Sequence, residues 1–153
     1  MNALTCLPES LCSWDFRVLG ASVACSVTFN FFTEQGGIAL GLKHLVVRKH
    51  GPMSGHWTLE DHGQPVAEAH KPDLFFRTFE IQAGSLRISA QAQTPFTRSF
   101  NILCGGRTVG TIRPAHAFTR RAFIECSPEV SEACQIFAFW LAALTWRRQA
   151  NNQ

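Results

Sequence analysis

Four histidines recur every six residues in the middle of the chain: His44, His50, His56 and His62. Neutral imidazole is a common ligand for transition metals, and paired strands could bring two of these rings together. Gly51-Pro52 interrupts the segment with a turn, however, so the even spacing does not put the rings on one face. No H-E-x-x-H or H-x-H motif occurs. We therefore predict surface or loop histidines, with no metal site and no cofactor.

The six cysteines are irregularly spaced and include no C-x-x-C pair, which argues against a zinc knuckle or a thioredoxin-type motif. We predict that most are small buried hydrophobes in a reducing compartment. Cys104 could form a nucleophilic dyad with His116 only if the fold brings them together. Gly105-Gly106 favours a hairpin turn at this point instead. A small metal-dependent or Cys/His-dependent hydrolase is therefore kept as an alternative function.

Basic residues are the remaining candidates for a site. Arg48 and Lys49 are adjacent, and Arg113, Arg120 and Arg121 flank one connection. Neighbouring strand residues face opposite ways, so only one of Arg120 and Arg121 can join any one patch. Guanidinium groups bind phosphate bidentately. If the fold brings them together, Arg48, Lys49, Arg113 and Arg120 would bind a phosphorylated lipid headgroup.

The composition bounds the class of protein. Of the 153 residues, 46% are hydrophobic and only 16% are charged, against about 25% in ordinary domains. Thirteen Phe and four Trp supply enough apolar surface to exclude intrinsic disorder. A net charge of +3 is too weak to indicate a nucleic-acid-binding protein. Residues 1–42 carry a net −2 and residues 43–153 a net +5, which hints at an anionic partner. The length predicts one domain over residues 1–153.

Short strands and turns dominate residues 18–126, which we predict to be barrel strands. The stretch Val18–Phe32 alternates with period two, as a strand with one buried face does. Turn signals at residues 60–63, 82–85 and 105–107 each separate a pair of apolar runs and predict three hairpins. Arg121–Cys126 is predicted as the last strand. Turns at this spacing are typical of a sandwich or barrel.

The C-terminal segment predicts a helix over residues 128–149. Ser127 is expected to cap it, and Arg147-Arg148 suit its negative end. Apolar residues of Cys134–Trp146 point in every direction, so the helix must be surrounded on all sides. The economical solution is an antiparallel β-barrel that encloses this hydrophobic helix and leaves no open sheet edge.

Two observations bear on membranes and targeting. The apolar run Cys134–Trp146 is shorter than the about 20 residues that a spanning helix needs, so no transmembrane span is predicted. The first fifteen residues contain no Lys or Arg, unlike a signal peptide. The expectation is a cytoplasmic protein, with a peripheral position at the membrane as the alternative.

Three local patterns resemble one known superfamily. They are the strand, turn and return strand of Trp57–Ala69, the pair Arg98–Ile102 with Val109–Ile112, and the helix Phe137–Trp146. Together they resemble the tubby C-terminal-like superfamily, which includes LURP-one-related proteins and phospholipid scramblases. The resemblance covers about residues 43–148, and the length is nearest to compact, bacterial-type LURP-one-like members. It implies a barrel threaded by a C-terminal helix, and it favours binding at a membrane surface or to a protein.

The combined prediction is a non-enzymatic tubby-like domain. Its partner would be the anionic headgroups of a membrane-surface phospholipid or another protein, and not a nucleic acid. No superfamily motif transfers a site to particular residues of this chain. A structural scaffold with no small ligand is the remaining alternative.

Overall fold

A computed structural model describes residues 2–73 and 76–152. Within them the chain forms strands followed by a single helix, α1 (Glu132–Asn151). The strands are β1 (Asn2–Pro8), β2 (Phe16–Leu19), β3 (Cys25–Phe29), β4 (Gly36–Leu40), β5 (Lys43–Lys49), β6 (His56–Asp61), β7 (Gln64–His70), β8 (Thr78–Ala83), β9 (Leu86–Ala92), β10 (Phe100–Cys104), β11 (Arg107–Pro114) and β12 (Ala122–Cys126).

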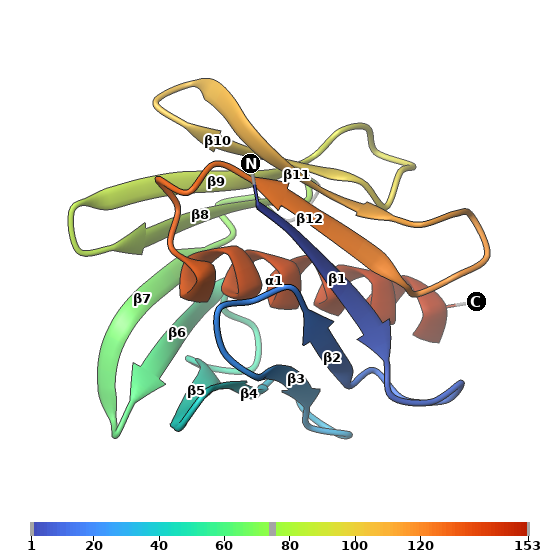
Figure 1. Ribbon diagram of the computed structural model, residues 1–153, viewed down its shortest axis with the longest axis horizontal. Helices are drawn as coiled ribbons and strands as arrows, with labels where there is room; N and C mark the ends of the chain where they lie inside the picture. The colour runs from blue at the N-terminus through green and yellow to red at the C-terminus, as the bar shows by residue number, and fades with distance from the viewer. Residues whose placement is uncertain (1, 74–75, 153) are drawn as a thin grey trace.

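These strands form one closed antiparallel barrel in chain order (Figure 1). Each strand pairs with the next, and β1 pairs with both β2 and β12, so that the first and last strands close the ring. In the closing pair, Leu4 lies opposite Ile124 and Cys6 opposite Ala122. Closure leaves no open sheet edge. The predicted mainly-β barrel with a C-terminal helix is thus confirmed.

Helix α1 runs through the barrel and is surrounded by it (Figure 1). Every residue from Cys134 to Arg147 is buried, and those from Ile136 to Leu144 are fully so. The helix lies close to β4, β8 and β12, which are evenly spaced around the ring. Phe139 packs edge-on against Phe16 of β2, with ring centroids 4.9 Å apart. The described part of the chain contains no helix long and apolar enough to cross a membrane.

Alternation along the strands supplies the inner wall. In β3 the inward residues are Cys25 and Val27, as the period-two pattern predicts. That pattern does not continue over Val18–Phe32, however. Gly20, with φ +93°, begins a turn between β2 and β3, and Phe31 is exposed in a loop. Strands also begin earlier than residue 18, because Asn2–Pro8 and Phe16–Leu19 complete the ring.

The helix begins four residues after its predicted start. Ser131 is the N-cap, and its hydroxyl accepts a hydrogen bond from the Cys134 amide at 3.3 Å. Residues 127–130 form a turn instead, since the Val130 amide bonds to the Ser127 carbonyl and the Ser127 amide to that of Val109. The helix also extends two residues beyond the predicted 128–149 range, to Asn151.

The two ends of the barrel differ. At one end the strands are joined by short turns such as His62-Gly63, where both φ angles are positive, as a two-residue hairpin turn requires. At the end where α1 finishes, the connections are longer (Figure 1). We call these six connections the rim loops: residues 9–15, 30–35, 50–55, 71–77, 93–99 and 115–121.

Replacing Phe139 with Ala should cost about 3–5 kcal/mol of unfolding free energy, because it leaves a cavity between the helix and β2. Urea denaturation followed by tryptophan fluorescence measures the loss. The control Phe96→Ala removes a ring that is 95% exposed and should change stability by about 0.5 kcal/mol or less. Equal losses in the two variants would contradict an enclosed helix.

Candidate functional site

Four rim loops are connected in series by three arginines, each of which binds the next loop. The Arg77 guanidinium donates to the carbonyls of Thr94 and Pro95, both at 3.0 Å, and also to that of Thr97 in the following loop. Arg98 in turn donates to three carbonyls of the loop after it. Arg120 continues the series by donating to the first rim loop, at the carbonyls of Ser10, Leu11 and Ser13.

Each of these arginines also lies over an aromatic ring. Arg98 lies 5.8 Å from the ring of Trp146 on α1, and Arg120 lies 5.2 Å from that of Trp14. Stacking on an aromatic face suits the planar guanidinium. The arginine series therefore fixes the rim loops to one another and to the end of the helix.

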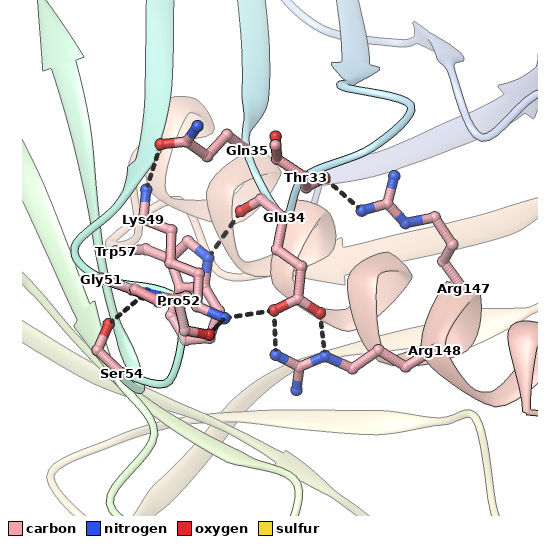
Figure 2. Close-up of polar contacts among 10 residues, drawn as sticks. All are labelled: Thr33, Glu34, Gln35, Lys49, Gly51, Pro52, Ser54, Trp57, Arg147 and Arg148. Atoms are coloured by element: carbon pink, nitrogen blue, oxygen red, sulfur yellow. Dashed lines mark hydrogen bonds and ion pairs between the residues drawn. The ribbon is translucent and has the colours of Figure 1, made fainter.

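The helix terminus holds the next rim loop, residues 30–35. Arg147 donates to the carbonyls of Asn30 and Thr33, both at 2.7 Å. Its neighbour Arg148 pairs with the Glu34 carboxylate, which also accepts from Lys49 at 2.6 Å (Figure 2). The Glu34 carbonyl accepts from the Trp57 indole at 3.0 Å. One carboxylate thus joins β5, a rim loop and the helix end.

The environment of Glu34 changes its protonation. Burial by itself raises the pKa of this carboxyl group, but the hydrogen bonds and positive charges of Arg148 and Lys49 outweigh it and lower the pKa to about 2. Burial lowers the pKa of the Arg77 and Arg98 guanidinium groups, which nonetheless stay charged.

Large apolar side chains project from the tips of all six rim loops. All but one of them are at least 87% exposed, and Phe76 is 63% exposed. Among the described residues, every exposed Phe belongs to this end of the barrel. We call the set the apolar crown: Leu11, Phe31, Phe32, Met53, Phe76, Phe96 and Phe118. Monomeric proteins rarely gather exposed rings in this way unless the surface binds something.

The same end of the barrel concentrates the positive charge. The rim loops, the last residue of β5 and the end of α1 carry eight Lys or Arg against four Asp or Glu, whereas the whole chain has a net charge of only +3. Four of the arginines donate hydrogen bonds to backbone carbonyl oxygens, which are uncharged and so do not neutralise them. These are Arg77, Arg98, Arg120 and Arg147. The eight are Lys49, Lys71, Arg77, Arg98, Arg120, Arg121, Arg147 and Arg148, and the four are Glu9, Asp15, Glu34 and Asp73.

Two pockets open among these residues. One, of about 480 Å³, is lined by Phe32, Glu34 and Lys49 with the loop that follows β5. The other, of about 590 Å³, is lined by Trp14, Phe31 and neighbouring residues including Arg147. Both combine aromatic walls with a basic group.

The structure does not bring the four predicted anion-binding residues together. Strands β5 and β11 are six positions apart in either direction around the ring. On β5, Arg48 pairs with Glu60 at 3.2 Å, while Lys49 belongs to the Glu34 network. On β11, Arg113 pairs with Glu125 at 3.2 Å, and Arg120 holds the first rim loop. A phosphate-binding role for any one of them stays a prediction.

The fold does not bring Cys104 and His116 together, and the hairpin turn that was predicted at Gly105-Gly106 is present. Cys104 ends β10 at the short-turn end of the barrel, whereas His116 lies in a rim loop at the other end, with all of β11 between them. The cysteines are free, and four of the six are buried, as expected for small hydrophobes. Burial raises the pKa of Cys25 and of Cys126 to about 11, which keeps these thiols unreactive.

Of the four regularly spaced histidines, only His50 and His56 meet, with ring centroids 4.6 Å apart. His44 and His62 are exposed elsewhere, on β5 and in the turn after β6. His56 also stacks on His70, which the six-residue spacing does not include, at 4.3 Å.

A repeated pattern in the sequence marks the arginine series, although it matches no known functional motif. Phe96-Thr97-Arg98 and Phe118-Thr119-Arg120 are 22 residues apart, and Phe76-Arg77 precedes the first by about the same interval. This interval equals the length of one hairpin of the barrel, from one rim loop to the next. A search for repeats would have found the pattern, but only the fold shows that its arginines bind neighbouring loops.

A comparison of the chain with protein-family models, with curated proteins and with solved structures finds no match.

Replacing Arg98 with Lys should reduce the unfolding free energy by about 1–3 kcal/mol. Although the Lys ammonium has three N–H donors, it lacks the planar fork that reaches three separate carbonyls and stacks on Trp146. Amide hydrogen exchange in residues 115–121 should become faster as well. The control Arg87→Lys, on an exposed side chain of β9, should leave both measurements unchanged. Unchanged exchange in Arg98→Lys would refute the proposed bracing of the loop.

Glu34 should make stability depend on acidity. Since its pKa falls from 4.5 to about 2 on folding, its contribution is present above pH 4.5 and is lost as the pH falls through about 2. Glu34→Gln should therefore be less stable than the wild type at pH 7, and the difference should shrink between pH 5 and pH 2. Urea denaturation across this range measures it, with the exposed Glu80→Gln as control.

Proposed function

We propose that this protein is a non-enzymatic domain that binds anionic membrane surfaces through its rim loops. The single observation that carries the proposal is the coincidence of the apolar crown with the concentration of Lys and Arg at one end of the barrel. Aromatic rings favour the boundary between water and hydrocarbon, and basic groups are attracted to anionic headgroups.

The charge arrangement favours a membrane over a neutral apolar partner. A bilayer with anionic lipids attracts each nearby Lys or Arg by about 1 kcal/mol. Arg77, Arg98 and Arg120 keep their positive charge because their partners are carbonyl oxygens. These groups lie at the base of the tips, where headgroup phosphates would lie once the rings are inserted.

The bracing of the loops supports the same function. Loops held in place beforehand lose little conformational entropy when their tips insert, so more of the gain from burying each ring is kept. Fully burying one Phe is worth about 1.5–3 kcal/mol. Several tips together with a basic rim supply the two signals that stable peripheral binding needs.

Membership of the tubby C-terminal-like superfamily is part of this proposal, supported by a closed antiparallel barrel around a C-terminal helix. That resemblance favours binding at a membrane surface. The proposed location is therefore the cytoplasm, with the protein peripheral at the membrane. A partner protein seated on the apolar crown is the second candidate. A Cys104–His116 hydrolase is disfavoured, since the two residues lie at opposite ends of the barrel.

Vesicle co-sedimentation tests the proposal. Wild-type protein should pellet with phosphatidylcholine vesicles that contain phosphatidylserine, and less with phosphatidylcholine alone or at high salt, because salt screens the charges. Phe96→Ser with Phe118→Ser should lower the partition coefficient at least about tenfold, given two lost rings. Neither ring is packed in the core, so the thermal midpoint should stay the same.

The matched control is Leu42→Ser, which removes an equally exposed apolar side chain from the opposite end of the barrel. It should pellet like the wild type. Absence of wild-type binding at low salt would sink the proposal. The proposal would also fail if the double Phe variant and Leu42→Ser bound vesicles equally. That result would favour a protein partner for the apolar crown.

A further inference from the structure

A second cluster of side chains that could bind a metal lies on the outer wall of the barrel, where β6 and β7 meet the rim loops. His56 begins β6 and His70 ends β7, and these two residues face each other in the strand register. Glu68 precedes His70 by two residues and so projects from the same face. Its carboxylate oxygens lie 3.4 Å from Nε2 of His56 and 3.9 Å from Nε2 of His70.

The His56 ring carries an unpaired nitrogen. Its Nε2 atom is buried and has no hydrogen-bond partner among the described residues. The Glu68 oxygen at 3.4 Å is near enough for attraction but does not meet hydrogen-bond geometry. Because buried polar atoms almost always have a partner, this nitrogen facing a carboxylate points to a ligand between them.

Neighbouring groups hold the cluster in position. The His50 ring stacks on His56 from the other side, and its Nε2 lies 2.8 Å from the Thr58 hydroxyl. Thr58 in turn donates to Glu60 at 2.7 Å. His56 and His70 are almost parallel, with 6° between the ring planes. Such supporting contacts orient imidazole ligands in known metal sites.

We propose that His56, Glu68 and His70 form a binding site for a divalent transition-metal ion of the zinc type. One donor atom from each lies within 4.8 Å of the others. Two imidazoles and one carboxylate are a ligand set that zinc accepts while it keeps a position for water or another ligand. Because the two imidazole rings are stacked nearly parallel, both side chains must rotate to turn their Nε2 atoms toward one ion at the about 2.0–2.2 Å that zinc requires.

The cluster borders a pocket. Glu68 and His70 line a hollow of about 470 Å³ that extends over β8 to β10 and includes Glu80 and Arg87. The three proposed ligands belong neither to the crown nor to the arginine series, so variants of them test the metal site separately from the membrane proposal.

Isothermal titration of chelator-treated protein with zinc chloride tests the site, in a Cys12→Ser background that removes the exposed thiol. One zinc ion per chain should bind. His70→Ala and Glu68→Gln should each weaken binding about tenfold or more. His44→Ala is the matched control, because His44 is an exposed histidine outside the cluster, and it should bind zinc like the parent.

Cobalt provides an independent readout. Co²⁺ bound at this site should give visible d–d bands without the strong near-ultraviolet charge-transfer band of thiolate ligands, and His70→Ala should abolish them. Failure of the parent to bind either ion would overturn the proposal. Equal zinc binding by His70→Ala and His44→Ala would also overturn it. A thiolate charge-transfer band would overturn it as well, because it would assign the metal to the cysteines.

Discussion

The structure depends on a helix that has no polar face. From Cys134 to Arg147 every residue of α1 is buried, so water must be excluded around its whole circumference. A flat sheet covers only one side of a helix, whereas twelve strands closed on themselves cover all of it. The low content of charged residues has the same cause, because a helix enclosed in a barrel exposes little of its own surface.

Enclosure creates a second requirement at the end where the helix finishes. There the last helical residues and six long loops meet, and their carbonyl groups need donors. Arginines supply these donors: one guanidinium can serve several carbonyls and stack on a ring. Because backbone oxygens do not cancel the charge, the same arginines leave this end of the barrel positive. The same arginines therefore both stabilise the rim and give it its positive charge.

Much of the fold could be predicted because its signals are local. Alternation of Cys25 and Val27, the turn at His62-Gly63 and the all-apolar run before Arg147 each lie within a few residues. The helix start was misplaced because Ser127 and Ser131 are both good caps, and only the turn made by residues 127–130 decides between them. Strand β1 was missed because its partner β12 lies more than a hundred residues away.

By itself the sequence determined a barrel around a buried helix, mostly buried cysteines and a basic main body, since composition and short-range periodicity encode these properties. Only the tertiary structure decided which charges and rings share a surface. It separated Arg48 from Arg113 by half the ring, joined Arg98 to the neighbouring loop, and set His70 beside His56. Ring closure and strand register fix such contacts between distant residues, and no local pattern records them.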